Sequence, residues 1–258
     1  MDLQISEQHF IICGASSGFG EAIARQLLIE GAKCTLVARR GDVLQDKFDH
    51  FKNQTDIIEG SLIYSETLDS IEKSAKNTET HGILFNAGGP PTGTPLNTDM
   101  KDWDSAWQLV MRWKIDLALR LAPVFRENGY GRMLFIESKS VKQPLPSLVL
   151  SNAFRAGVTG FAKTLSLEIA KDGVTVNVLA PGSHETPAIE RIIKNNSSIR
   201  GVSYDQAKKE MENNIPVGRM GKAEEFASLA AWLLSPHSGY ITGQTIGHDG
   251  GSVLGLFG

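Results

Sequence analysis

Short apolar runs alternate with longer amphipathic stretches along the whole chain. The short runs have the composition of strands, and the longer stretches carry apolar residues at helical spacing. The predicted strands are His9–Cys13, Lys33–Ala38, Asp56–Glu59, Gly82–Phe85, Met133–Glu137, Thr175–Leu179 and Gln244–Gly247. The predicted helices lie near 19–30, 42–53, 66–77, 101–127, 150–171, 204–213 and 222–234. This alternation predicts an α/β, doubly wound fold with a seven-stranded parallel sheet.

Composition narrows the class of protein. No linker, repeat or low-complexity block divides the 258 residues, so we expect one domain over 1–258. A net charge of -3 gives no basic excess for nucleic acid. No apolar run approaches the roughly 20 residues of a membrane span, and the N-terminus lacks the pattern of a signal peptide. Cys13 and Cys34 fall in predicted strands, as small buried hydrophobes of a reducing compartment. We therefore expect a cytoplasmic protein without nucleic-acid or membrane partners and without a metal site.

A glycine-rich turn, Gly14-Ala15-Ser16-Ser17-Gly18-Phe19-Gly20, follows the first predicted strand and opens a helix. Glycines let the backbone approach a pyrophosphate, and the free N–H groups at the helix N-terminus favour the negative charge. The spacing differs from the usual Gly-x-Gly-x-x-Gly fingerprint, and plain turn chemistry is the alternative. Its position after the first strand predicts a Rossmann-type dinucleotide site.

The end of the second strand indicates which dinucleotide fits. A site for NAD places an acidic residue there to bind the ribose 2′-hydroxyl, whereas this chain has Arg39 and Arg40. Guanidinium groups form planar, charge-assisted bonds with phosphate oxygens, so the pair favours NADP(H). A solvated arginine pair at a helix start is the alternative.

Ligands of such sheets bind outside the carboxyl ends of the strands. The residues that follow predicted strands there are Gly14, Arg39, Asn86, Ser138 and Pro181. The segment from Ser183 to Ser203 is predicted to be a mobile loop that covers the substrate.

Six motifs, in order, resemble those of the short-chain dehydrogenase/reductase family over essentially the whole chain. They are Gly14-x-x-x-Gly18-x-Gly20, Asn86-Ala87-Gly88, the segment 131–138, the segment 177–182 with Thr186, the segment 216–221, and 242–244 with 249–251. The nearest character is that of the 3-oxoacyl-carrier-protein-reductase-like members, which implies a homotetramer or homodimer and a small-molecule substrate. The apolar tail 253–257 then either docks on a neighbouring subunit or packs on its own core.

The turn, the arginine pair and the resemblance together give the candidate cofactor-binding residues. They are Gly14, Ser16, Ser17, Gly18, Phe19, Gly20, Arg39, Arg40, Ser61, Asn86, Ala87, Gly88, Arg155, Pro181, Gly182 and Thr186. Ser61 stands near the position where the family has an aspartate that contacts adenine, so adenine binding is expected to be weaker.

The catalytic positions depart from the family pattern of a serine, a Tyr-x-x-x-Lys pair and a helix asparagine. Ser138 matches the family serine, whereas Ser151 and Arg155 stand where the tyrosine and lysine are expected. Val110 stands at the asparagine position. Ser138, Ser151 and Arg155 are the candidate catalytic residues, and Ser151 and Arg155 share one helix face.

These changes remove the usual proton donor. A guanidinium stays protonated and a serine hydroxyl is a poor acid, so reduction of a simple carbonyl is expected to be slow. Lys114 and His184 are candidate substitutes, but an interface or snorkelling lysine and an ordinary loop histidine are the simpler interpretations. Glu137 is expected to point to the opposite face of the sheet. None of Tyr64, Tyr130 and Tyr240 is placed to replace the missing phenol.

Three functions follow in order of preference. The first is an NADP(H)-dependent short-chain dehydrogenase/reductase, which transfers hydride to or from a carbonyl, alcohol or conjugated enone with atypical proton chemistry. The second is an NADP(H)-binding sensor or partner subunit without redox turnover. The third, a lyase-like site, is disfavoured because the glycine turn is intact.

Overall fold

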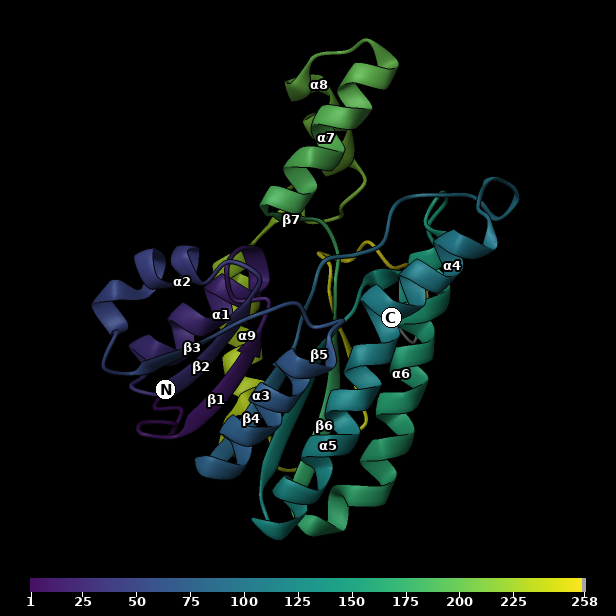
Figure 1. Cartoon of the computed structure of the whole chain (residues 1–258). Helices are drawn as coiled ribbons and strands as arrows, with labels where there is room; N and C mark the ends of the chain where they lie inside the picture. Colours follow the sequence, from purple (N-terminus) through teal and green to yellow (C-terminus); the bar gives the residue numbers. More distant parts are fainter. Residues whose placement is uncertain (257–258) are drawn as a thin grey trace.

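A parallel sheet of seven strands forms the centre of the molecule, in the order β3-β2-β1-β4-β5-β6-β9 (Figure 1). The computed structural model describes residues 1–256. The strands are β1 (His9–Cys13), β2 (Lys33–Ala38), β3 (Thr55–Glu59), β4 (Thr80–Phe85), β5 (Gly131–Ile136), β6 (Val174–Pro181) and β9 (Thr245–His248). The predicted Rossmann-type fold is confirmed, and every predicted strand is present with small changes at its ends.

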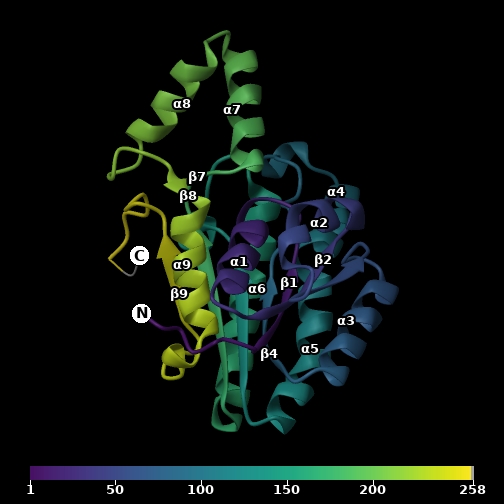
Figure 2. The ribbon, with the colours of Figure 1, turned by 90° about the vertical axis from the view of Figure 1, so that its left-hand side faces the viewer.

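Helices cover both faces of the sheet (Figures 1 and 2). On one side lie α1 (Gly18–Ile29), α2 (Gly41–Phe48) and α9 (Ala223–Leu234); on the other lie α3 (Ser65–Asn77), α5 (Trp113–Glu127) and α6 (Val149–Ile169). The predicted helix 101–127 is α4 (Met100–Ala106), a π-helical segment (Trp107–Arg112) and α5 in succession. Short 3-10 turns are Asp49–Phe51, Pro95–Asn97, Lys139–Val141, Ala170–Asp172 and Pro236–Ser238.

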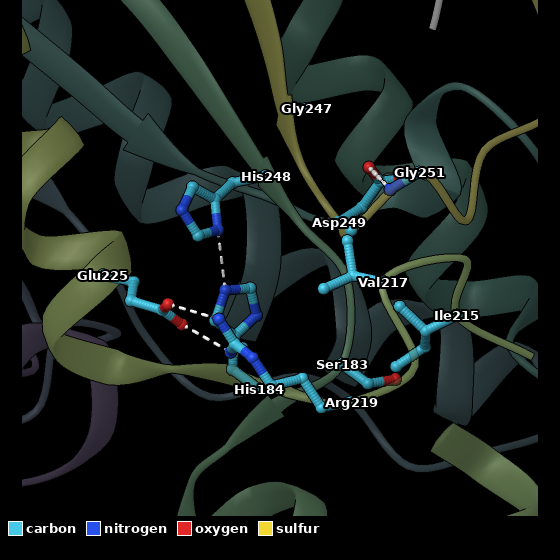
Figure 3. Close-up of a pocket in the computed structure, with 12 residues that line it drawn as sticks. Ser183, His184, Ile215, Val217, Arg219, Glu225, Gly247, His248, Asp249 and Gly251 are labelled. Carbon is cyan, nitrogen blue, oxygen red and sulfur yellow. Dashed lines mark hydrogen bonds and ion pairs between the residues drawn. The ribbon is translucent and has the colours of Figure 1, made fainter. Parts of the chain in front are cut away.

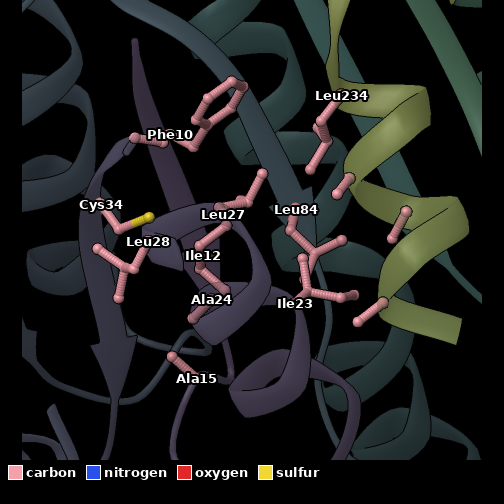
Figure 4. Packing of buried hydrophobic residues seen from close by; sticks show 14 of the residues in the cluster. Phe10, Ile12, Ala15, Ile23, Ala24, Leu27, Leu28, Cys34, Leu84 and Leu234 are labelled. Atoms are coloured by element: carbon pink, nitrogen blue, oxygen red, sulfur yellow. The ribbon is translucent and has the colours of Figure 1, made fainter. Parts of the chain in front are cut away.

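Strand alternation divides the core in two. In β1, Phe10 and Ile12 pack with α1 and α9, whereas Ile11 and Cys13 pack with α3 and α5. Figure 4 shows the first cluster, where Phe10 and Ile12 lie beside side chains of α1. A strand buried on both faces is uniformly apolar, which explains why β1 shows no polar alternation. Both cysteines are free and buried as predicted.

The segment from Ser183 to Ser203 is not a loop, and that prediction is wrong. It contains β7 (His184–Glu185), which pairs with β8 (Gly221–Lys222), and α7 (Pro187–Arg200). Thr186 caps α7 by accepting a hydrogen bond from the Ile189 N–H, and Pro187 occupies the first helical position.

α7 and α8 (Tyr204–Asn213) project beyond the carboxyl edge of the sheet in both views (Figures 1 and 2). They share a small core of their own, formed by Ile193, Ala207, Ile215 and Met220. Whether this helix pair moves over a substrate stays a prediction.

The tail folds back on its own chain as far as Leu254. Ser252 accepts a hydrogen bond from Lys139, and the Leu254 N–H donates to Gln143. The Leu254 and Leu256 side chains are exposed, and Phe257 lies outside the described residues. Within residues 1–256 no helix is both long and apolar enough to cross a membrane.

A buried histidine at the start of β1 predicts that the stability of the fold depends on pH. His9 bonds through Nδ1 to Thr80 (3.0 Å) and through Nε2 to Thr35 (2.9 Å), and burial lowers its pKa to about 4. Since the unfolded chain takes up this proton near pH 6.5, the stability is complete above that pH and is lost as pH falls towards 4. We expect a loss of about 2 kcal/mol between about pH 6.5 and about pH 5 from this group.

Urea unfolding at both pH values checks this prediction, with His9→Gln as the comparison. The glutamine keeps hydrogen-bonding capacity but does not titrate. An equal fall in the free energy of unfolding for both proteins would contradict it.

Candidate active site

The glycine turn lies where the connection order of the sheet reverses, between β1 and β4. Gly14 has φ +68°, and a Cβ there would stand 2.6 Å from the Asn86 carbonyl oxygen. A Cβ on Gly20 would stand 2.2 Å from the Gly14 carbonyl oxygen. The Asn86 side-chain amide lies 3.4 Å from the Cys13 carbonyl oxygen, to which it donates. The turn therefore requires glycine and is fastened to the end of β4.

The N-terminus of α1 is open to a ligand. Ser17 is the N-cap residue, is exposed, and makes no side-chain capping bond. The first N–H groups of a helix lack partners within the helix, so this end can receive an anion. Ser16 is half-buried, and Phe19 packs on the rings of His184 and Phe226 instead of facing the open end.

The arginine pair is free to bind a phosphate. Arg39 and Arg40 follow β2 and are exposed, and their side chains make no hydrogen bond or ion pair within residues 1–256. Ser61 follows β3 and is half-buried. The Glu59 carboxylate lies beside Gly41 at the start of α2, so one negative charge accompanies the two positive ones. The net positive balance fits a phosphate at the end of β2.

The segment after β6 closes over the glycine turn. A Cβ on Gly18 would be 3.8 Å from the Thr186 side chain, which places Thr186 above the turn. Pro181 ends β6, and the Gly182 N–H donates to the His248 carbonyl oxygen at 3.0 Å. Ala87 is half-buried and Gly88 exposed in the loop after β4.

Ser138 lies just beyond β5. Its hydroxyl oxygen accepts a hydrogen bond from the Ser140 N–H (3.1 Å) and caps the 3-10 turn that follows. The hydroxyl hydrogen has no acceptor among residues 1–256. It is therefore available to a bound molecule.

Ser151 and Arg155 lie one turn apart near the start of α6 and are both largely buried. The Arg155 Nε–H donates to the Ser151 hydroxyl oxygen at 2.9 Å, which leaves the hydroxyl hydrogen free to be donated. The start of α6 is fixed because the Asn152 side chain bonds to the backbone of Leu145. The predicted pairing of Ser151 with Arg155 is thus present as a direct hydrogen bond.

Glu137 does not point to the opposite face, and that prediction is wrong. Alternation continues one residue past the strand: Phe135 packs on the side of α5 and α6, Ile136 packs on the side of α1 and α9, and Glu137 again faces α5 and α6. The Glu137 Oε1 accepts from Lys114 Nζ at 2.5 Å, and Oε2 accepts from Arg155 Nη1 at 3.2 Å. Lys114 is only 2% exposed, so neither the interface nor the snorkelling interpretation holds. We call Lys114, Glu137, Ser151 and Arg155 the Glu137 cluster.

The Glu137 cluster holds two cations and one carboxylate away from water, a formal charge of +1. Burial lowers the pKa of Lys114, and the adjacent Glu137 carboxylate opposes that shift. Arg155 Nη1 also donates to the Glu137 carbonyl oxygen at 3.0 Å. The arrangement can stabilise negative charge on a ligand, and its guanidinium cannot act as an acid.

The helix that precedes the cluster contains a π-helical segment. Val110, at the family asparagine position, is buried within it at 1% exposure. Such segments change the register of the residues that follow, and Lys114 comes four residues later. The lysine therefore supplies a polar side chain to the site from the helix that carries the family asparagine.

His184 is buried and paired with a second histidine (Figure 3). Its Nδ1 lies 3.1 Å from the Gly182 carbonyl oxygen, and its Nε2 lies 2.8 Å from His248 Nδ1. Burial lowers the pKa of His184, and Phe19 and Phe226 pack against its ring. An open pocket of about 400 Å³ lies beside the pair and runs to Gly251. The ordinary loop interpretation is wrong, because the ring is part of the packing beneath β7.

All four tyrosines lie away from the Glu137 cluster in sequence and in the fold. Tyr130 and Tyr240 precede β5 and β9, and therefore lie towards the opposite edge of the sheet. Tyr64 is exposed after β3, and Tyr204 packs in the α7–α8 core. No phenol accompanies Ser138, Ser151 and Arg155.

A glycine turn at the switch point and a polar cluster at the end of β5 define a dinucleotide-binding class of α/β protein. The family model described as enoyl-(acyl carrier protein) reductase matches residues 14–253. The chain belongs to the short-chain dehydrogenase/reductase family.

Relatives match over nearly full length. The NADPH-dependent reductase BacG of Bacillus subtilis (strain 168) is 28% identical over 260 residues, covering 98% of this chain and 100% of the relative. The 3-oxoacyl-[acyl-carrier-protein] reductase FabG of Thermotoga maritima is 29% identical, covering 95% and 97%. The structure of L-sorbose reductase from Gluconobacter frateurii, complexed with NADPH and L-sorbose, has a TM-score of 0.93 at 28% identity and covers 99% and 100%.

Sequence reasoning missed the part played by Glu137 and Lys114. The signal was present, because each is a charged residue directly beside apolar positions that are buried. Opposite charges on two such segments indicate a buried pair.

The contact between Gly20 and Gly14 gives a test of the turn. Gly20→Ala is expected to lower the free energy of unfolding by about 1–3 kcal/mol, because the added methyl group collides with backbone. Gly160→Ala is the control, since no atom lies within 4 Å of its added Cβ in α6. There alanine should stabilise by about 0.5–1 kcal/mol. Urea unfolding measures both, and equal signs for the two variants would refute the steric account.

Proposed function

We propose that the chain is an NADP(H)-dependent oxidoreductase that acts on a small carbonyl, alcohol or enone, and that it favours conjugated enones. Ser138, Ser151 and Arg155 stabilise the oxygen that becomes negative. Support comes from the matched family, described as enoyl-(acyl carrier protein) reductase, and from a relative named as an NADPH-dependent reductase. The observation that carries the proposal is the Ser151–Arg155 hydrogen bond, which leaves a hydroxyl donor beside a fixed positive charge.

The turn and the arginine pair would hold NADP(H). The N-terminus of α1 faces the pyrophosphate, Arg39 and Arg40 face the 2′-phosphate, and Arg155 Nη2 is the nitrogen left for the nicotinamide ribose. Asn86, Ala87, Gly88, Pro181, Gly182 and Thr186 complete the cradle, and Ser61 lies on the adenine side. Bound NADPH would supply the hydride.

A conjugated substrate fits a site that lacks a phenol. Hydride addition at the β-carbon moves the electron pair of the carbon–carbon double bond towards the carbonyl and gives an enolate. The enolate takes its proton from water at carbon, so enone, NADPH and one proton give the saturated ketone and NADP⁺. The protein needs only to stabilise the oxyanion, which the two hydroxyls and the guanidinium can do. A simple ketone would instead give an alkoxide that needs an acid at the oxygen.

The same proposal treats residues 1–258 as one catalytic domain that assembles as a homotetramer or homodimer. The second candidate is NADP(H) binding without turnover, as in a sensor or partner subunit. The specific observation in its favour is that no tyrosine lies at the site.

Substrate panels distinguish the two candidates. We expect NADPH oxidation with conjugated enones and little or none with simple ketones or alcohols, because only the first reaction avoids an acid at the oxygen. NADPH absorbance measures the rate. Tight NADPH binding with no turnover of any enone would reject the oxidoreductase and favour the second candidate.

The paired variant Ser151→Tyr with Arg155→Lys is the companion experiment. It restores a phenol and a lysine one helical turn apart, so simple ketones should become substrates. If ketone reduction does not rise above that of the parent, the assignment of these two positions is wrong.

The arginine pair predicts cofactor preference. Replacing both Arg39 and Arg40 with alanine should weaken NADPH binding by about tenfold or more and leave NADH binding nearly unchanged, because only NADPH carries the 2′-phosphate. Quenching of intrinsic fluorescence measures both affinities. Arg126→Ala, which removes an exposed guanidinium paired with Asp172, is the matched control. Equal losses for both dinucleotides would contradict the assignment.

A further inference from the structure

We propose that Glu137 is a positioning residue for Arg155: its carboxylate, held from the other side by Lys114, sets the direction of the guanidinium and keeps the buried cluster at a charge of +1. The effect of this positioning on a substrate rests on the proposed function. The contacts of Glu137 with Lys114 and Arg155 do not depend on it.

The guanidinium of Arg155 is committed on two of its three nitrogens. Nη1 donates to the Glu137 carboxylate and to the carbonyl oxygens of Ile136 and Glu137, and Nε donates to Ser151. Nη2 makes no hydrogen bond within residues 1–256, and a Cβ on Gly89 would stand 3.3 Å from it. One nitrogen is thus directed towards the loop after β4, beside the predicted cofactor site.

Lys114 determines where the carboxylate lies. Its ammonium donates to Glu137 Oε1 and, at 3.3 Å, to the Ile136 carbonyl oxygen that also receives Arg155. The two cations come from different helices, α5 and α6, and share one carboxylate and one backbone oxygen. Glu137 therefore joins both helices to the end of β5. A shift of either cation would alter the hydrogen bonds that the other makes to the shared oxygens.

The charges of the Glu137 cluster distinguish a positioning role of Glu137 from simple packing, because removing its carboxylate changes the titration of Lys114. The ionisable groups that act on Lys114 are Glu137, Arg155 and the Cys13 thiol. Burial raises the pKa of Cys13, so the thiol is neutral. Without the Glu137 carboxylate, two buried cations face each other, and the pKa of Lys114 falls further because a guanidinium does not release its proton. Lys114 then titrates, and the surroundings of Arg155 change with it.

Nuclear magnetic resonance of the Arg155 Nε–H group in the full chain measures its hydrogen exchange and its chemical shift, which report on its hydrogen bond and on nearby charge. The Arg155 signal is assigned by its loss in Arg155→Lys. In the parent we expect slow hydrogen exchange, and any change of the chemical shift that follows Lys114 should come at a higher pH than in a variant without the Glu137 carboxylate. In Glu137→Gln we expect exchange at least about tenfold faster and a chemical shift that follows the protonation of Lys114.

The double variant Lys114→Met with Glu137→Gln separates position from charge. It removes one cation and one anion, so the cluster keeps its charge of +1 and the chain avoids an unpaired buried lysine. Exchange at Arg155 should stay fast, whereas the pH-dependent shift should vanish. Glu72→Gln, which removes a half-buried carboxylate of α3 that pairs with Lys76 and Arg120, is the matched control and should leave the Arg155 signal as in the parent.

Activity gives an independent readout. In the parent background Glu137→Gln should lower kcat/KM for the enone by about tenfold or more. In an Arg155→Ala background it should lower it no further, because Glu137 acts through Arg155.

Two results would overturn the proposal: slow Arg155 exchange that persists in both Glu137 variants, or additive losses of activity. A pH-dependent shift that survives without Lys114 would overturn the part concerning charge. If the parent reduces no enone, the proposed function fails while the resonance experiment still decides the role of Glu137.

Discussion

The buried carboxylate of Glu137 is the constraint on which the rest of the site depends. A carboxylate at this depth is stable only when it is paired and hydrogen-bonded, and here it receives one cation from α5 and one from α6. Because both helices are joined to the end of β5 through it, the position of Ser151 also depends on it, through Arg155. Glu137, one residue beyond β5, thus connects β5 with α5 and α6.

The Ser151–Arg155 pair differs from a tyrosine–lysine pair in how its groups titrate. In a tyrosine–lysine site the lysine lowers the pKa of the phenol, and both groups titrate. In this chain the guanidinium has a permanent charge and the serine hydroxyl hardly ionises at all. Under the proposed function, the fixed positive charge takes the place of a proton donor, which suits a substrate that needs only its oxygen stabilised.

Much of the fold follows from the sequence because its signals are local. The uniformly apolar β1, followed by the glycine turn and the apolar spacing of α1, specifies strand, turn and helix within about twenty residues. The α7 helix was missed because its sequence is polar and buries only Ile193, although Thr186 and Pro187 form an ordinary helix start. The helix propensity of a sequence is weak evidence for a helix such as α7, which packs mainly on its neighbour α8.

The site was less predictable because it depends on contacts between distant segments. Ser151 and Arg155 could be paired from helical spacing alone. The direction of Glu137 follows the alternation of Phe135 and Ile136 along β5, but the sequence alone does not say which face of the sheet carries α5 and α6. The partner Lys114 lies twenty-three residues away on another element, and only tertiary packing brings the two charges together.

The two cysteines have a practical consequence for watching this molecule at work. Cys13 and Cys34 are sealed inside the sheet, and burial raises the pKa of both thiols, so alkylating reagents and mild oxidants meet almost no thiolate. The native chain is therefore chemically silent towards thiol labels. A single cysteine introduced on the exposed side of α7 would carry a dye or spin label without any native cysteine having to be removed, and it would report whether the α7–α8 pair moves as ligands bind.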